Sequence, residues 1–400
     1  MTERAPGRSG SSSLLWAAYL AVSWTWCIGM FLPVLLVRDY GIWGFVMFAA
    51  PNVLGAGAMG WVLSRQGSER CVAAHSGAVR AFSAITVAYH LWFVFFLTNA
   101  GWVSGPIWPI IAVGIFALAA ISGVQARPPT ESLLPYGVSL AAIAYCMFAG
   151  IQVGIPKGNV DESFGIPGAI WLIPVCAFGF LLCPYLDATF HRARQSLTDA
   201  GARTAFTLGF GVLFLVMILF TLAYAGLLLG LTTAAPRVLT AIVVHMLVQS
   251  GYTCGLHIRE MPRRTKASPL WTALGAIFLL GICALTIRIP VADNIAPWFE
   301  FGYRIFLAAY GLLFPAYVWL VMLPWGHERP PARAIGAWLA VCAIAAPAFW
   351  MGFIEHREWW LEPGVGLLLI AKIFMPRPGA GATPPPEPTT PDGLHPASHA

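Results

Sequence analysis

Long apolar stretches take up most of this chain and restrict what it can fold into. Of its 400 residues, 58% are hydrophobic and only 10% are charged. A bilayer core about 30 Å thick needs about 20 apolar residues per helix, and we place twelve such stretches along the sequence. We therefore predict an all-α polytopic membrane protein with about twelve transmembrane helices.

The predicted segments are joined by short loops rich in Gly, Pro and charge, so no soluble domain is expected between them. They are Ser13–Val37, Gly41–Ser64, Val79–Thr98, Pro106–Val124, Leu134–Val153, Pro167–Leu186, Thr204–Leu231, Arg237–His257, Pro269–Ile287, Phe301–Leu323, Ala334–Phe353 and Trp360–Met375. Residues 1–12 precede them. Residues 376–400 are rich in Pro, Gly and Thr, and we expect a disordered tail there because they offer little apolar surface to bury.

Basic residues predict the orientation of the segments, because Lys and Arg are retained on the cytoplasmic side during insertion. With twelve spans, seventeen of the 23 Lys and Arg residues fall on one side, whereas acidic loop residues such as Asp161, Glu162 and Glu355 fall on the other. We expect an inner (plasma) membrane protein with both termini in the cytoplasm. The same distribution explains the net charge of +6 without nucleic-acid binding.

The first and sixth segments are interrupted in the same way. The first contains Gly29 and Pro33, and the sixth contains Gly179 and Pro184. Proline removes a backbone hydrogen bond, and backbone groups freed at membrane depth must face protein, water or an ion. One such segment is an ordinary proline kink, but a matched pair is typical of secondary transporters built from two inverted repeats, where the broken helices form the binding site.

The sixth segment continues as Pro184-x-x-Asp187-x-Thr189-x-x-Arg192. A broken helix leading into this string resembles the sixth helix and following loop of nucleobase-cation symporters, and sodium:solute symporters have a related basic loop. Both belong to the LeuT-like amino acid–polyamine–cation superfamily. The strong match covers about twenty residues, and Phe190-His191 departs from the nucleobase pattern. The resemblance therefore implies a divergent relative of these symporters.

A five-plus-five inverted repeat with discontinuous helices 1 and 6 is the fold that this resemblance implies. Residues 13–153 would form the first repeat, with helices 1–5, and residues 167–323 the second, with helices 6–10. Residues 334–375 would form the peripheral helices 11 and 12, and residues 1–12 a cytoplasmic N-terminal segment.

The resemblance also implies a central substrate site between helices 1, 3, 6 and 8, with aromatic side chains against the solute. The residues at the matching places are Trp24, Trp26, Gly29, Trp92, Phe178, Gly179 and Phe180. Gln249 in the eighth segment is added as a polar contact because an amide is rare at such depth.

The resemblance also implies a sodium site, because transporters with the LeuT-like fold hold sodium between carbonyls at the first break and hydroxyls of the eighth helix. The candidates here are Cys27, Ser250 and Thr253, and the two hydroxyls lie three residues apart instead of side by side as is usual in the family. Asp187 and Arg192 would form a salt-bridged cytoplasmic gate.

His90 and His245 are ionisable groups inside predicted segments, where such groups are candidates for function. They could carry protons or ligate haem. No Asp or Glu lies in the centre of any predicted segment, which favours neutral, zwitterionic or anionic solutes. The eight cysteines show no metal or redox spacing.

These features predict a secondary active transporter, which carries a small-molecule solute across the lipid bilayer together with sodium or a proton. We expect no bound cofactor and no enzyme activity. The alternatives are a membrane redox protein or polytopic enzyme that uses the buried histidines, and a solute receptor of the same fold that does not transport.

Overall fold

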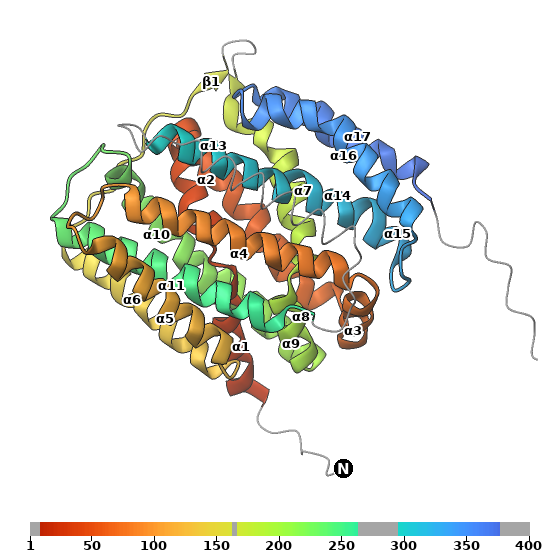
Figure 1. Ribbon diagram of the computed structural model, residues 1–400, viewed down its shortest axis with the longest axis horizontal. Helices are drawn as coiled ribbons and strands as arrows, with labels where there is room; N and C mark the ends of the chain where they lie inside the picture. The colour runs from red at the N-terminus through yellow and green to blue at the C-terminus, as the bar shows by residue number, and fades with distance from the viewer. Residues whose placement is uncertain (1–8, 162–165, 263–294, 377–400) are drawn as a thin grey trace, which may run out of the picture.

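A bundle of long helices makes up the computed structural model, which describes residues 9–161, 166–262 and 295–376 (Figure 1). Nine helices in these ranges are long and apolar enough to cross a membrane. This finding supports the predicted polytopic membrane protein. The predicted segment Pro269–Ile287 and residues 377–400 of the predicted tail lie outside the described residues.

Helices form nearly all of the regular structure in these ranges. They are α1 (Ser9–Trp24), α2 (Cys27–Val62), α3 (Arg65–Ala74), α4 (Ser76–Asn99), α5 (Trp108–Gln125), α6 (Leu133–Phe148), α7 (Ile173–Leu182), α8 (Ala188–Ser196), α9 (Asp199–Leu208), α10 (Leu215–Leu228), α11 (Pro236–Glu260), α13 (Ile295–Ala308), α14 (Phe314–Tyr317), α15 (Leu323–Trp325), α16 (Ala332–Phe353) and α17 (Leu361–Ala371). Short π-helical stretches join α9 to α10 and α13 to α14 and α15. Two short strands, β1 (Val160–Asp161) and β2 (Ile166–Pro167), pair antiparallel.

Helix α2 contains two spans, because the chain reverses at Gly41. This residue has φ 62° and ψ −151°, a conformation that glycine adopts without the strain of a side chain. The Trp24 indole, just before α2, donates a 2.6 Å hydrogen bond to Asn52 Oδ1. A straight helix would carry Asn52 about 37 Å from Cys27. The two halves of α2 therefore run antiparallel, as the predicted segments require.

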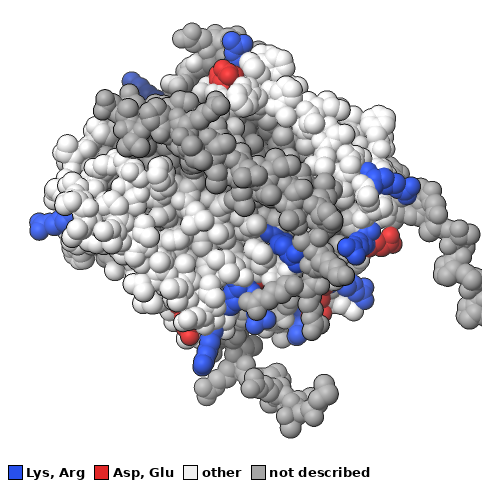
Figure 2. All heavy atoms as spheres, viewed as in Figure 1, with Lys and Arg blue, Asp and Glu red and all other residues white. Residues whose placement is uncertain are grey.

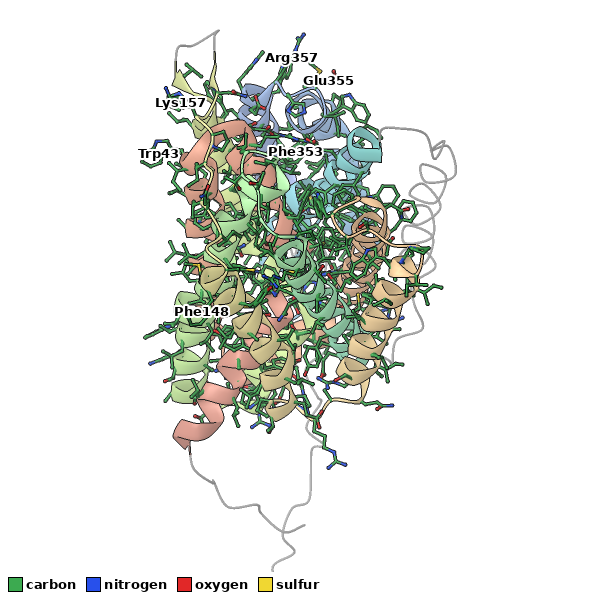
Figure 3. All side chains as sticks on the ribbon, turned by 90° about the vertical axis from the view of Figure 1, so that its left-hand side faces the viewer. Trp43, Phe148, Lys157, Phe353, Glu355 and Arg357 are labelled. Carbon is green, nitrogen blue, oxygen red and sulfur yellow. The ribbon has the colours of Figure 1, made fainter. Side chains whose placement is uncertain are left out.

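Apolar side chains cover the side of the bundle, and charged side chains lie towards its ends. Phe148 is 93% exposed and Trp43 is 56% exposed, and both point outward in Figure 3. Lys157, Glu355 and Arg357 lie at the upper end of the same view. Among the described residues in Figure 2, those across the middle of the visible face are mostly white, and the Lys and Arg atoms lie mainly over its lower and right-hand parts. An apolar surface of this extent is unfavourable in water and is typical of a surface that contacts a lipid bilayer.

The bundle has two ends with different elements. The α3 end carries α3, α8 and α9, and the β1 end carries the strand β1 and the turn at Gly41 (Figure 1).

Glycines let α11 and α7 pack closely against their neighbours. A Cβ on Gly251 or Gly255 would lie 2.4 or 2.2 Å from backbone oxygens of α5, and a Cβ on Gly55 would lie 2.1 Å from the carbonyl oxygen of Phe180 in α7. Small residues at such contacts allow backbones to approach. The contacts fix α11 and α7, the two helices that bring polar side chains to the interior.

Candidate functional site

The first helix break lies between α1 and α2, where Thr25 and Trp26 are not helical. The Thr25 hydroxyl donates to the Ala21 carbonyl at 2.7 Å, and the Trp26 indole donates to the Ser23 carbonyl at 2.5 Å. The Thr25 hydroxyl thus adds to the bond that the Thr25 amide makes to the Ala21 carbonyl, and the Trp26 indole binds the Ser23 carbonyl near the helix end. The discontinuity in the first predicted segment is therefore present.

Its position differs from the sequence prediction. Gly29 and Pro33, which we expected at the break, both lie inside α2. A proline within a helix removes one hydrogen bond but does not by itself end the helix. Local bonds from the side chains of Thr25 and Trp26 to the backbone accompany the end of α1, and glycine and proline content does not reveal such bonds.

His90 of α4 caps the start of α2. Its Nε2 accepts a hydrogen bond from the Cys27 amide at 3.2 Å. Its Nδ1 lies 2.7 Å from the Thr86 carbonyl oxygen, which can only accept, so Nδ1 carries the proton and the imidazole is neutral. The Tyr303 hydroxyl donates to the Cys27 carbonyl at 2.9 Å. Side chains from other helices therefore bind both backbone groups of Cys27.

The second break lies between α7 and α8. A 3₁₀ turn from Cys183 to Leu186 follows α7, and Asp187 is extended. Asp187 Oδ1 accepts hydrogen bonds from the Thr189 amide and hydroxyl, both at 2.7 Å, and from the Phe190 amide at 3.4 Å. This is an N-cap, which satisfies the free amides at the start of a helix. The string Pro184-x-x-Asp187-x-Thr189 thus encodes a turn and a helix cap.

The two residues that we expected to interrupt the sixth segment have different places. Pro184 lies in the 3₁₀ turn, whereas Gly179 lies inside α7. A Cβ on Gly179 would lie 2.9 Å from the Tyr310 carbonyl oxygen. Gly179 therefore permits a close approach between α7 and the π-helical stretch after α13.

Asp187 lies inside the protein and not in a solvated loop at the end of the helix. It has no exposed surface, and its Oδ2 atom lies 3.8 Å from Nε2 of His257, which is equally buried. Arg192 lies 3.8 Å from Glu260 instead. The ion pair that we expected between Asp187 and Arg192 is absent from this structure. Asp187 follows the last residue of the sixth predicted segment, but it is fully buried at the second break.

His257 places a second ionisable group at the same point. Its Nδ1 lies 3.2 Å from the Ser83 hydroxyl of α4, and its ring meets the Trp26 ring edge to face at 5.5 Å. Neither His257 Nε2 nor Asp187 Oδ2 has a hydrogen-bond partner among the described residues. The two breaks therefore meet at one buried polar centre.

An apolar cavity of about 90 Å³ lies between the breaks on the β1 side of this centre. This volume is large enough for several water molecules or one small organic molecule. Its walls include Trp24, Trp26, Gly29, Asn52, Gly179, Phe180, Cys183, Leu307 and Tyr310. Most of these walls are apolar or aromatic, and the Asn52 side chain is bound to Trp24.

Five of the residues predicted for the substrate site line this cavity. They are Trp24, Trp26, Gly29, Gly179 and Phe180. The rings of Trp24 and Trp26 lie 4.5 Å apart, and Trp24 also lies 4.8 Å from Phe190 of α8. The aromatic wall thus joins the two breaks.

The structure places the other three predicted substrate residues elsewhere. Trp92 stacks on Phe299 of α13, with ring centroids 6.3 Å apart, and Phe178 meets Trp319 at 6.5 Å. The Gln249 amide donates to the Ser139 hydroxyl of α6 at 2.7 Å. These side chains belong to helix contacts outside the cavity.

Sequence reasoning missed Asn52, Tyr310 and His257 as interior polar groups. Asn52 gave a signal, since it is an amide within an apolar segment. Tyr310 and His257 gave none, because their neighbours come from helices distant in the sequence. Tyr310 bonds Thr86 at 2.9 Å, and His257 faces a residue seventy positions earlier.

The predicted cation residues lie where α11 meets α1 and α2. The Thr253 hydroxyl donates to the Val22 carbonyl of α1 at 3.2 Å. Ser250 has a buried hydroxyl with no hydrogen-bond partner among the described residues. The Cys27 carbonyl is occupied by Tyr303. Hydroxyl and carbonyl oxygens of this kind suit a hard cation.

His90 and His245 have separate surroundings. His245 Nδ1 lies 2.9 Å from the Ser139 hydroxyl, and its ring meets Phe220 at 5.5 Å, whereas both nitrogens of His90 are bonded to backbone atoms. No cluster of three or more His, Cys, Asp or Glu side chains suited to a metal occurs in the part of the chain that the structure describes.

An ion network closes the β1 end of the cavity. Arg38 of α2 binds both oxygens of Glu300 in α13 at 2.7 Å and also Asp39. Arg304, which lines the cavity, binds Glu300 at 2.7 Å and Asp39 at 3.1 Å. Bidentate arginine–carboxylate pairs of this kind are strong and directional. The network therefore ties α2 to α13 across the mouth of the cavity.

Comparisons with known proteins add no relative. A scan against models of protein families gives no match for this chain, and a search of curated proteins finds no match.

Proposed function

We propose that this protein is a cation-coupled solute symporter that works by alternating access. The observation that carries the proposal is the cavity between two helix breaks. Discontinuous helices expose backbone groups at membrane depth, and transporters with inverted repeats bind solute and ion there. The match of the first and sixth predicted segments supports a LeuT-like five-plus-five arrangement, distantly related to nucleobase-cation and sodium:solute symporters.

Barriers on both sides of the cavity support a gated pathway. The network of Arg38, Asp39, Glu300 and Arg304 closes the β1 end. Towards the α3 end, the buried Arg194 side chain donates to the Leu63 carbonyl at 2.5 Å and pairs with Asp199. We assign the α3 end to the cytoplasm, as the distribution of basic residues predicts. This arrangement corresponds to an occluded state, from which either barrier opens in turn.

The cavity wall suggests the class of solute. Trp24, Trp26, Phe180 and Tyr310 present aromatic surfaces, and Arg304 and Glu358 line the cavity near the ion network. Arg304 is already paired with two carboxylates, and Glu358 accepts a hydrogen bond from Tyr40. A small, largely apolar or aromatic solute without net charge fits this lining best.

Ligand binding to the purified protein tests the proposal. A panel of uncharged and zwitterionic small solutes is screened by thermal shift in sodium chloride and in choline chloride at equal ionic strength. A solute at 100 times its Kd stabilises the folded protein by about 2.7 kcal/mol, so a binder raises the Tm. The expected result is at least one stabilising solute that is also taken up by proteoliposomes against its gradient. Binding without uptake under any ion gradient would contradict transport.

Phe180 and Phe178 offer a matched pair of variants for the site. They lie two residues apart on α7, but Phe180 lines the cavity and Phe178 packs on Trp319. We expect Phe180→Ala to weaken the apparent solute affinity, measured from the rise in Tm with solute concentration, at least tenfold. Phe178→Ala should lower only the Tm of the solute-free protein. Equal loss of solute binding in both variants would place the solute elsewhere.

A further inference from the structure

Asp187 and His257 form a buried pair that the transport proposal leaves unused. Neither side chain has exposed surface, Asp187 Oδ2 and His257 Nε2 lie 3.8 Å apart, and neither atom has a hydrogen-bond partner among the described residues. We propose that this pair binds a single proton and that the proton is the coupling ion of the symporter. The second half of this inference rests on the proposed function.

An ionised Asp187 would have no permanent cation beside it. Its Oδ1 atom accepts only neutral hydrogen bonds from Thr189 and Phe190. The two arginines that follow are engaged elsewhere, Arg192 with Glu260 and Arg194 with Asp199. An uncompensated carboxylate in a dry interior costs several kcal/mol. The closed structure therefore needs a proton on this pair.

One proton satisfies both unpartnered atoms. With the other imidazole hydrogen on Nδ1, the proton is carried by Asp187 Oδ2 and donated to a neutral His257, or carried by Nε2 of a doubly protonated His257 and donated to an ionised Asp187. The pair is neutral overall in both forms. A separation of 3.8 Å leaves no room for a water molecule between the atoms. A shift of about 1 Å brings them to the 2.7–2.9 Å of a charge-assisted hydrogen bond. The proton thus belongs to the pair and not to either residue alone.

Other titratable groups near the pair do not replace this proton. Those that face it from the surrounding elements are Tyr19 of α1, His90 of α4, Cys183 before α8, and Tyr310. The Cys27 amide and the Thr86 carbonyl hold His90 neutral. At the end of α11, Glu260 is compensated by Arg259 at 2.7 Å.

The pair lies between two cavities of different character. Trp26, Cys183 and Tyr310 separate it from the apolar cavity towards the β1 end. Towards the α3 end, a second, more polar cavity of about 120 Å³ is lined by Ala188, His191, Arg192, Gln195 and Glu260. Ala188 follows Asp187 directly, and Glu260 lies about one helical turn beyond His257. Water in the second cavity would reach the pair after a small separation of α8 from α11.

Protonation of the pair then shifts the equilibrium between the closed state and the state open to the second cavity. With the proton bound, the pair is neutral and α8 can pack against α11 without water. After the proton leaves, the pair carries a net negative charge that is stabilised by hydration, so the state open to the second cavity gains population. This difference in proton affinity between the two states is the requirement for coupling.

Proton release from the solute-free, full-length protein tests this inference. The purified protein is moved from about pH 5.5, where ordinary carboxyl groups are already ionised, to about pH 9 in weakly buffered detergent solution, and the released protons are counted with a pH-indicator dye. We expect the wild type to release about one proton more than Asp187→Asn, which keeps an N-cap side chain. Infrared difference spectra of the same samples should lose the signals of the shared proton in both Asp187→Asn and His257→Gln.

Two control variants remove residues of the same types at comparable places in the fold. His245→Gln removes another fully buried histidine of α11, and Asp199→Asn removes another carboxylate at a helix start; both should release protons as the wild type does. Titration of Asp187→Asn and His257→Gln that matches the wild type would overturn the inference. His257→Gln also covers the case in which Asp187→Asn does not fold.

Failure of this inference is distinguishable from failure of the proposed function. Solute stabilisation that requires sodium and persists in Asp187→Asn would contradict proton coupling and leave the symporter intact. A proton bound by the pair in a protein that transports none of the panel solutes would contradict the symporter while supporting the proton site.

Discussion

The two helix breaks solve the same problem with different chemistry. At the first break, neutral groups bind the free backbone atoms, and the neutral imidazole of His90 binds the Cys27 amide. At the second, the carboxylate of Asp187 does so and leaves one oxygen unpaired beside His257. The difference indicates that the first break is held in one ionisation state, whereas the second can respond to a proton.

The largest effect should follow from removing the cap of the second break. Asp187→Ala leaves the Thr189 amide and hydroxyl without their acceptor, so we expect the free energy of unfolding to fall by about 2–4 kcal/mol. Asp187→Asn should lose much less, because its amide oxygen still accepts. Thermal unfolding in detergent measures both. Equal Tm values for the two Asp187 variants would contradict the role of the cap.

A smaller effect is expected at the first break. His90→Phe keeps a ring but leaves the Cys27 amide unpaired, which should cost about 1–3 kcal/mol. His90→Gln offers an acceptor and should recover part of the loss. The pH dependence of proton release should be unchanged in both, because His90 stays neutral in this structure. Loss of the released proton in His90→Gln would show that the first break is also ionisable.

The smallest effect is a pH dependence that belongs to neither break. His75, between α3 and α4, faces the Tyr317 hydroxyl and the Gly326 carbonyl oxygen, both at 3.0 Å. Burial lowers the pKa of His75 from its usual value near 6.5, because a buried imidazolium loses hydration. The unfolded chain therefore binds the proton more readily, and stability should fall as the pH drops through 6.5.

His75→Gln should remove this part of the pH dependence from the Tm profile. Removing the His75 contribution sharpens the comparison of the two breaks. The pH dependence of the Tm that remains can then be compared with that of Asp187→Asn. An identical fall of the Tm in wild type and His75→Gln would show that His75 does not contribute.

Hydropathy predicted the positions of the spans well because burial in lipid acts on the average of many residues. The segments expected at Val79–Thr98 and Ala334–Phe353 correspond to α4 and α16 within three residues at each end. The reversal between the first two segments also matches the turn at Gly41. These features depend on local composition, which the sequence displays directly.

The site was harder to predict because it depends on contacts across the fold. Glycine and proline marked two weakened helices, but hydrogen bonds from Thr25, Trp26 and Asp187 accompany the actual helix ends. The resemblance led us to expect Asp187 in a cytoplasmic gate with Arg192. Only the position of His257, on a distant helix, explains how Asp187 is accommodated inside.

The ion network at the β1 end has an electrical consequence. Its two guanidinium groups, Arg38 and Arg304, balance two carboxylates, Asp39 and Glu300. One unit charge that crosses a membrane potential of 100 mV gains or loses about 2.3 kcal/mol. A network without net charge that moves as a unit exchanges almost no energy with the field, so membrane voltage would leave this closure unaffected and act instead on whichever ion crosses with the solute.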